Sequence, residues 1–250
     1  GVPTVAAAAA VAAVTLVATS CAPVPPAAPG PGPVPPDRPV VVTGPSAQVD
    51  PFVGTAPADA VSPVPGGTTG DTFPGATVPF GAVQWSPDTP NAENPAGYAW
   101  ADETIDGFSL THFSGAGCDN SGLVRFVPSV DTVTATAGRF SHDRERARPG
   151  SYEVELDSGV DVSLAAATRS GLGRFTVPTG RSPVVTIDNA PRTYEGVPVL
   201  AVGEIGAVDD RTVEGVAVGG QFCTSPTQHR MWFRVEWSRP FDVVDRDLLG

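Results

Sequence analysis

The sequence predicts an all-β fold, arranged as an antiparallel β-sandwich. From Ser46 onward, apolar and polar residues alternate over short runs, which is the two-residue period of a strand with one buried face. Gly, Pro, Asn or Asp separates these runs, as turn residues do. Helical periodicity is scarcely seen, and many short strands joined by turns favour a sandwich.

Residues 1–20 have the composition of a secretory signal peptide. Residues 5–18 form an uninterrupted run of small and apolar residues. A run of 14 residues is too short to cross a bilayer, which takes about 20, but it fits the apolar centre of a signal peptide. We therefore expect an exported protein whose charged n-region lies upstream of Gly1. The alternative, a buried helix, is disfavoured by the Pro-rich stretch that follows.

Cys21 directly follows Ala18, Thr19 and Ser20, and this order resembles a bacterial lipoprotein cleavage site. Acylation of the Cys21 thiol would anchor the chain to a membrane, firmly so if several acyl chains are attached. Ala18 stands where Leu is usual, so the match is imperfect. The alternative is cleavage after Ser20 and a freely secreted protein.

Residues 21–45 form a Pro-rich linker with ten prolines in 25 residues. Such a stretch cannot pack a core and favours extended polyproline II, which suits a stalk. Residues 46–138 are rich in Gly, Pro, Thr and Asp, and loops this long in a domain are usually functional or disordered. Aromatic residues scattered through this part indicate order: Phe52, Phe73, Phe80, Trp85, Tyr98, Trp100, Phe108 and Phe113.

Strands follow in the second half of the chain. Residues 152–156 and 160–164 alternate on both arms around Asp157-Ser158-Gly159, which predicts a β-hairpin. Further strands are expected at 174–177, 184–187, 213–218 and 231–237. In the last of these, two alternating sets predict two faces, one with Trp232, Arg234 and Glu236 and the other with Met231, Phe233, Val235 and Trp237.

The charge balance argues against nucleic-acid binding. All 15 basic residues are Arg, against 27 acidic residues, and the net charge is −12. A phosphate-binding face needs an excess of Lys and Arg, and the field of this chain would repel polyanions.

Few residues stand in a pattern typical of catalysis or metal binding. His112, His142 and His229 lack metal-ligand spacing, and the G-x-S-x-G pattern of hydrolase nucleophiles is missing from the sequence. A spatial Ser/His/Asp triad remains an alternative. Cys118 and Cys223 can either form one disulfide in an exported chain or stay as buried thiols.

One turn has the chemistry of a sugar contact. Asp71 and Thr72 precede Phe73 in a Gly- and Pro-rich stretch, so a carboxylate stands beside an aromatic ring. A ring stacks on the C–H face of a sugar, and a carboxylate accepts hydrogen bonds from its hydroxyl groups. The alternative is a rigid turn with a buried Phe73.

Several ordered motifs resemble glycoside hydrolase family 92. The first are residues 49–55 (VDPFVGT), 71–81 (DTFPGATVPFG) and 83–89 (VQWSPDT). They are followed by Gly97-Tyr98 and by residues 105–118 (IDGFSLTHFSGAGC), which are similar to the family's GFSHTHLSGTGC stretch. Residues 140–142 (FSH) with 149–152 (PGSY), 221–223 (QFC) and 239–241 (RPF) continue in register to the end of the chain.

This resemblance implies an exported bacterial α-mannosidase that depends on calcium and inverts the anomeric carbon. The family joins an N-terminal β-sandwich to a C-terminal (α/α)₆ barrel, so residues 46–250 are expected to be the sandwich alone. The catalytic acids and calcium ligands lie mainly on the barrel. We therefore assign no catalytic or metal residue here and expect this part of the enzyme to be inactive alone.

By the same resemblance, the sandwich supplies part of the sugar pocket. Phe73 would stack on the sugar, Asp71 and His112 would hydrogen-bond its hydroxyls, and the Gly115/Gly117 turn would let the backbone approach. The full set of expected pocket residues is Asp71, Thr72, Phe73, Tyr98, His112 and Cys118. Two departures from the family pattern stand out. Leu110 replaces a family His, which removes one possible polar contact. Residues 90–96 lack the Trp of the family's α-1,2-mannosidases, and Trp100 follows the Gly-Tyr motif instead, which leaves the linkage preference open.

The function predicted from these features is that of a calcium-dependent inverting exo-α-mannosidase acting on α-mannosides and N-glycans. Its expected partners are mannose-containing glycans, the barrel of the same protein and, through Cys21, a membrane. The alternatives are a non-catalytic carbohydrate-binding surface lipoprotein, which would bind mannosides with this domain alone, and a structural wall protein, which would bind none.

Overall fold

A computed structural model describes residues 44–57, 69–90, 95–115, 122–188, 193–194, 197–198, 200–201, 203–220 and 227–242. The predicted signal peptide, nearly all of the Pro-rich linker, and Cys21, Cys118 and Cys223 lie outside the described residues. Val42–Gly250 form one compact unit. Among the residues that are described, no helix is long and apolar enough to span a membrane.

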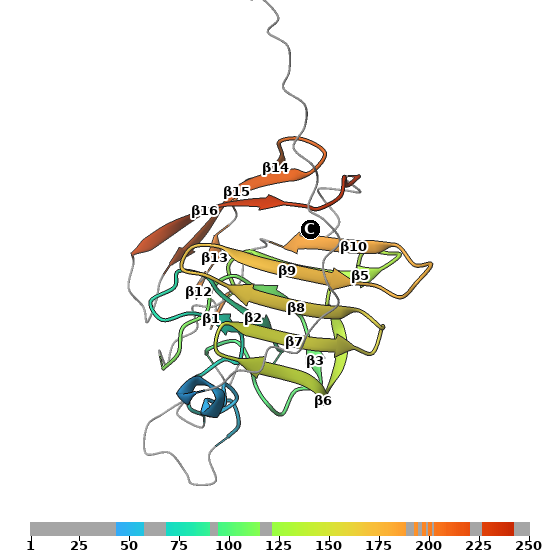
Figure 1. Ribbon diagram of the computed structural model, residues 1–250. Coiled ribbons are helices and arrows are strands. Elements are labelled where there is room, and N and C mark those ends of the chain that lie inside the picture. The colour runs from blue at the N-terminus through green and yellow to red at the C-terminus, as the bar shows by residue number, and fades with distance from the viewer. Residues whose placement is uncertain are drawn as a thin grey trace, which may run out of the picture. The chain divides into compact units, whose positions relative to one another are not determined.

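One sheet has five antiparallel strands in the order β1-β2-β4-β5-β10 (Figure 1). These strands are β1 (Ala76–Thr77), β2 (Gln84–Asp88), β4 (Gly107–Ser109), β5 (Arg125–Val130) and β10 (Pro183–Asp188). Most residues of β2, β4 and β5 are buried, not only every second one. This sheet is therefore covered on both faces, and the two-residue period is weak in its strands.

A second five-stranded sheet has the order β3-β6-β7-β8-β9. Its strands are β3 (Thr104–Ile105), β6 (Gly138–Arg148), β7 (Ser151–Leu156), β8 (Asp161–Ala166) and β9 (Gly171–Thr176). β7 and β8 form the predicted hairpin, with Val154 opposite Val162 and Gly159 in the turn at a φ of +82°. The inner face of β7 is buried and its glutamates are exposed, as the alternation predicts.

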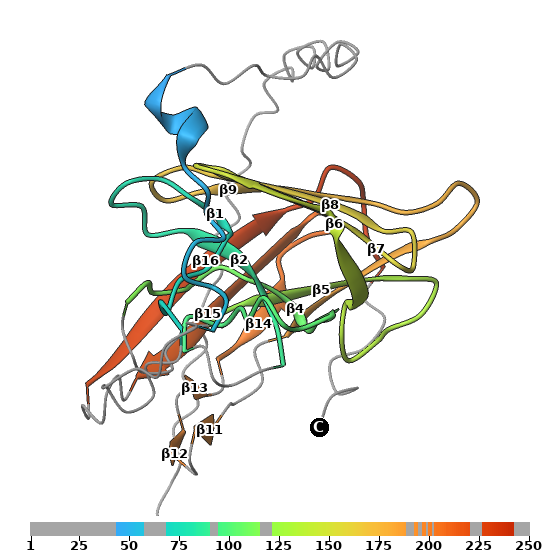
Figure 2. The same ribbon diagram turned by 90° about the horizontal axis from the view of Figure 1, so that it is seen from below.

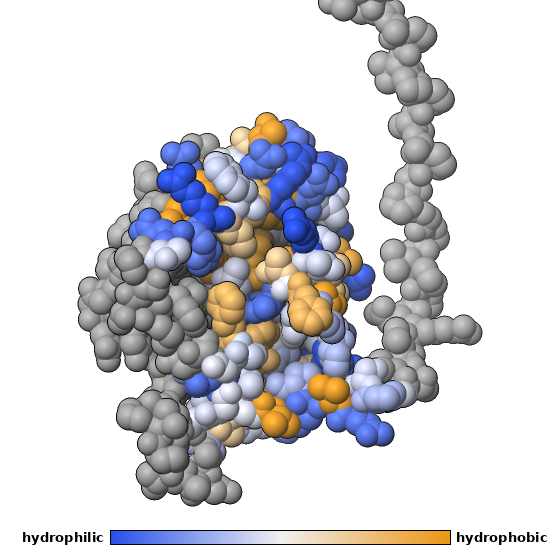
Figure 3. All heavy atoms as spheres, turned by 90° about the vertical axis from the view of Figure 1, so that its left-hand side faces the viewer, coloured by the Kyte–Doolittle hydropathy of each residue, from blue (hydrophilic) through white to orange (hydrophobic). Residues whose placement is uncertain are grey.

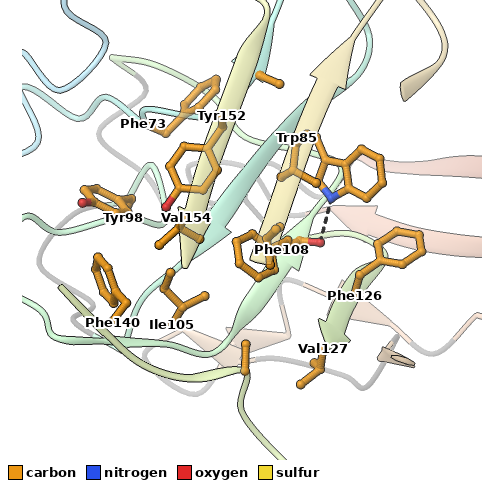
Figure 4. Packing of buried hydrophobic residues seen from close by; sticks show 14 of the residues in the cluster. Phe73, Trp85, Tyr98, Ile105, Phe108, Phe126, Val127, Phe140, Tyr152 and Val154 are labelled. Carbon is orange, nitrogen blue, oxygen red and sulfur yellow. Dashed lines mark hydrogen bonds between the residues drawn. The ribbon is translucent and has the colours of Figure 1, made fainter. Parts of the chain in front are cut away.

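The two sheets pack face to face through aromatic side chains (Figure 4). The Trp85 indole of β2 lies over β9, where a Cβ at Gly171 or Gly173 would come within 2.8 Å or 2.5 Å of a ring carbon. Trp85 Nε1 also donates to the carbonyl oxygen of Phe108 at 3.1 Å. The ring of Phe108 lies 6.3 Å from that of Tyr152 on β7. The all-β sandwich predicted from the sequence is thus confirmed.

A third sheet joins β13 (Leu200–Ala201), β14 (Ile205–Ala207), β15 (Thr212–Gly220) and β16 (Gln228–Glu236), and β11 (Thr193–Tyr194) pairs separately with β12 (Val197–Pro198). Figure 2 shows β15 and β16 as a long ribbon. Met231, Phe233, Val235 and Trp237 pack against the core while Trp232, Arg234 and Glu236 point away, as predicted. The remaining element is a 3₁₀ turn, η1 (Pro45–Gln48).

Candidate functional site

Four loop segments are tied together beside β1 and β2, and we call them the loop cluster: residues 50–57, 69–75, 97–102 and 110–115. Backbone hydrogen bonds connect them, from Gly70 N to the Gly54 oxygen at 2.8 Å and from Trp100 N to the Thr55 oxygen at 3.0 Å. These bonds join segments more than 10 residues apart, so each loop fixes the path of another.

Asp71 lies at the centre of the cluster, half-buried, with a φ of +49°. Its backbone oxygen accepts from Gly115 N at 2.6 Å, and its Oδ1 accepts from the Thr69 hydroxyl at 3.1 Å. Thr72 Oγ1 donates to the Val53 oxygen at 2.7 Å. The structure therefore brings the predicted Asp71 and Thr72 next to the Gly115 turn.

His112 is buried behind this turn, only 1% exposed. Its Nε2 lies 3.1 Å from Asp88 Oδ1, and its Nδ1 lies 2.9 Å from the Gln84 oxygen, so the ring fastens the loop to β2. The Phe73 ring packs 5.1 Å from the imidazole and is 8% exposed. Within this domain both side chains shape the loop from inside, and their contact with a sugar stays a prediction.

The structure also brings together a serine, a histidine and an aspartate. The Ser109 hydroxyl donates to Asp88 Oδ1 at 2.8 Å and lies 3.5 Å from His112 Nε2. All three residues are buried, and the hydroxyl hydrogen points to the carboxylate instead of to the base. A nucleophile needs its base beside it and access to substrate, so this group is structural.

Tyr98 reaches a buried glutamate that the sequence did not single out. The Tyr98 hydroxyl donates to Glu145 Oε2 at 2.9 Å, and Tyr152 donates to Oε1 at 2.5 Å. Burial, followed by the charge of Glu145, raises the pKa of both Tyr98 and Tyr152. His142 Nδ1 lies 2.8 Å from Oε2, so three side chains converge on one carboxylate.

This network supports an aromatic hollow on the surface. His142 Nε2 lies 2.7 Å from the Trp100 oxygen, and the two rings stack at 3.8 Å with 10° between their planes. Trp100 is 37% exposed and meets the Phe52 ring at 5.2 Å. The hollow measures about 230 Å³ and is lined by Asp50, Phe52, Val53, Thr55, Ala56 and Trp100.

Four residues of this network and hollow were not predicted as site residues from the sequence: Phe52, Trp100, His142 and Glu145. The period-two pattern around β6 marks neither Glu145 nor His142 as buried or paired, because both stand in a run of charged residues. Phe52 and Trp100 were noted as signs of order, and Phe52 also as part of the motif at residues 49–55, but neither was predicted to line the pocket. In the described part of the chain, no group of three or more His, Cys, Asp or Glu is arranged to hold a metal ion.

Residues 48–246 match the family model described as the glycosyl hydrolase family 92 N-terminal domain. The chain belongs to glycoside hydrolase family 92. The resemblance seen in the motifs is thereby confirmed, and the all-β domain is the N-terminal domain of that family.

Solved structures of this family share the fold. A family 92 α-mannosidase from Bacteroides thetaiotaomicron, in complex with mannoimidazole, is 28% identical with a TM-score of 0.63, over 78% of this chain and 25% of that one. A family 92 inverting mannosidase from the same organism is 25% identical with a TM-score of 0.53, over 67% and 21%.

A curated relative is the uncharacterized secreted glycosidase of Arthroderma benhamiae, 28% identical over 157 residues. The alignment covers 56% of this chain and 19% of that protein. The chain thus spans about a quarter or less of these three glycosidases.

Proposed function

We propose that this chain forms the sugar-pocket part of an exported, calcium-dependent, inverting exo-α-mannosidase that acts on α-mannosides and N-glycans. The observation that supports it is the loop cluster of a family 92 domain, in which Asp71 and the Gly115 turn are held side by side at the surface. Two structural relatives are mannosidases, one of them inverting.

In this proposal the loop cluster binds and orients the sugar. The half-buried Asp71 carboxylate accepts hydrogen bonds from ring hydroxyls, in a backbone geometry that Gly115 N helps to fix. A Cβ at Gly115 would have nothing within 4 Å, so space is open above this turn for a ligand to approach. Tyr98 and His112 position the loops from inside the domain.

The bond-breaking groups are assigned to the part of the enzyme that extends beyond this domain in its relatives, the proposed (α/α)₆ barrel. An inverting enzyme needs an acid for the leaving oxygen and a base for water, about 6.5–9.5 Å apart. The described residues offer no fitting metal site, so no calcium ligand is assigned to this domain and no step is derived through the ion.

Export and anchoring complete the proposal. The apolar run before Ser20 and the small residues before Cys21 support a signal peptide and an acylated Cys21, and the Arthroderma relative is described as secreted. Mass spectrometry of the mature N-terminus tests this part. We expect an acylated Cys21, and an unmodified N-terminus at Cys21 would favour a freely secreted enzyme.

The experiment that tests the activity uses the longest protein that carries this domain. α-Linked mannobioses of each linkage are supplied with and without a calcium chelator. We expect hydrolysis that the chelator abolishes and that calcium restores. Mannoside binding by residues 46–250 that is as tight as binding by the longer protein, with no hydrolysis by either, would favour the carbohydrate-binding lipoprotein.

A further inference from the structure

The outer face of the third sheet carries two rows of side chains. Strand register places Gly206 beside Glu214 and Glu214 beside Arg234. In the next row, Val216 pairs with Trp232. The backbone N–H of Val216 donates to the backbone oxygen of Glu204 at 2.8 Å. Alternate residues of a strand share a face, so both rows point away from the core.

Trp232 is the exposed centre of this face. Its side chain is 75% exposed, whereas the neighbours Met231 and Phe233 pack against the core. An indole that the core does not use offers a flat apolar surface with a polar N–H at its edge. Beside it lies an open hollow of about 560 Å³, whose lining includes Glu204, Gly206, Glu214, Val216, Trp232 and Arg234.

Hydrogen-bonding groups are fixed next to the indole. Arg234 Nη1 donates to Glu214 Oε1 at 2.6 Å, and its Nε donates to Glu236 Oε1 at 2.9 Å. These hydrogen bonds raise the pKa of Arg234 and hold its planar guanidinium in place. A Cβ at Gly206 would have nothing within 4 Å, so the space above the first row is open.

The charges of this face select the class of ligand. The Arg234 guanidinium is paired with the carboxylates of Glu214 and Glu236, and Glu204 lines the same hollow. Arg230 is exposed on the same face of β16, two residues before Trp232. The acidic groups around Arg234 disfavour an anionic ligand at this point. A cationic ligand would be repelled by the positive charge of Arg234. A neutral polyhydroxylated ring is compatible with the carboxylates and with the guanidinium, because each hydroxyl can donate to a carboxylate or accept from the guanidinium.

We propose that this face is a second carbohydrate site, which binds a neutral hexopyranoside stacked on Trp232 and hydrogen-bonded to Arg234 and Glu214. The choice of a sugar rests on the proposed function. The site shares no residue with the loop cluster: it lies on β14–β16, which Figure 1 shows at the top, whereas the loop cluster consists of residues 50–57, 69–75, 97–102 and 110–115. The upper part of Figure 3 shows hydrophilic side chains gathered on this region.

The site holds the protein on a polymer without taking part in hydrolysis. Affinity electrophoresis of the longest protein that carries this domain, in gels with a soluble neutral α-mannan, measures this retention. We expect Trp232→Ala to reduce retention at least tenfold while kcat/KM on mannobiose stays within twofold. Asp71→Ala is the matched variant, and we expect it to lower hydrolysis and leave retention in place.

Competition identifies the ligand. We expect methyl α-D-mannopyranoside to release the protein from the gel, and methyl glucuronoside and tetramethylammonium to leave it bound. Retention that is unchanged in Trp232→Ala overturns the proposal, and so does release by tetramethylammonium alone, which would mean a cation site. If the wild-type protein hydrolyses no mannobiose but is retained on the gel in a Trp232-dependent manner, the proposed catalytic function is wrong and the second carbohydrate site is supported.

Discussion

Replacing Glu145 by Gln tests the network behind the loop cluster. The Glu145 side chain is buried and accepts hydrogen bonds from two tyrosines, with His142 beside it. Glutamine keeps the shape of the side chain but turns one of its two acceptor oxygens into an N–H donor. At least one buried donor must then lose its acceptor.

The structure sets the size of this effect. If the amide nitrogen replaces Oε1, it faces the Tyr152 hydroxyl. If it replaces Oε2, it faces both Tyr98 and His142. In the first arrangement only the Tyr152 hydroxyl loses its acceptor, and a buried donor without an acceptor costs about 1–3 kcal/mol. We expect Glu145→Gln to lower the free energy of unfolding by that amount, and Tm by about 2–4 °C for each kcal/mol.

Urea unfolding followed by tryptophan fluorescence and by circular dichroism measures this change. Glu153→Gln is the control, since Glu153 lies on the exposed face of β7, and its effect should stay within about 0.5 kcal/mol. Adding Tyr152→Phe to Glu145→Gln removes the hydroxyl that lacks an acceptor. The double variant should therefore recover part of the lost free energy of unfolding. A stability unchanged in Glu145→Gln would refute the account of the network.

Three further predictions concern packing, ionisation and binding. Gly173→Ala should destabilise the domain by about 1–3 kcal/mol in urea unfolding, because its Cβ would lie 2.5 Å from a Trp85 ring carbon. Because the pKa values of Tyr98 and Tyr152 are raised in the folded protein, unfolding releases protons above about pH 10. The free energy of unfolding should therefore be independent of these tyrosines below that pH. Above it, the free energy of unfolding should fall by up to about 1.4 kcal/mol per pH unit for each tyrosine. Absorbance at 295 nm should therefore show at most a third of the three tyrosines ionised at pH 11 until the protein unfolds. Asp71→Ala should lower kcat/KM on mannobiose about 10- to 100-fold, the value of one charged hydrogen bond of about 1.5–3 kcal/mol.

Each of these predictions has a control and a contrary result. Gly206→Ala adds a Cβ in open space and should leave stability unchanged, so equal losses at Gly173 and Gly206 would contradict the packing argument. Tyrosine absorbance that rises fully near pH 10 in the folded protein would contradict the burial of the two hydroxyls. Asp143→Ala, an exposed carboxylate on β6, should keep full activity.

The sequence predicted those parts of the fold that depend on local pattern. The β7–β8 hairpin and the two faces of β16 follow from alternation, and both are present as predicted. The doubly buried strands β2 and β4 were not predicted, because a strand covered on both faces has no clear period. The assembly of β13–β16 into a third sheet is likewise a long-range feature.

The same limit applies to the candidate site. Asp71 and Thr72 could be singled out because their motif is dense in turn residues, and the structure places them beside Gly115. Glu145 escaped notice because its partner Tyr98 lies 47 residues away, and no local pattern reports such a contact. Cys118, also predicted for the pocket, lies outside the described residues.

The most direct test of the central claim is an NMR time course of mannobiose hydrolysis by the longest protein that carries this domain, run for the wild type and for Asp71→Ala. We expect β-mannose to appear first and mutarotation to yield the α-anomer afterwards, and we expect Asp71→Ala to slow the reaction 10- to 100-fold at low substrate. Release of α-mannose first, no release with any linkage, or an Asp71→Ala variant as fast as the wild type would contradict it.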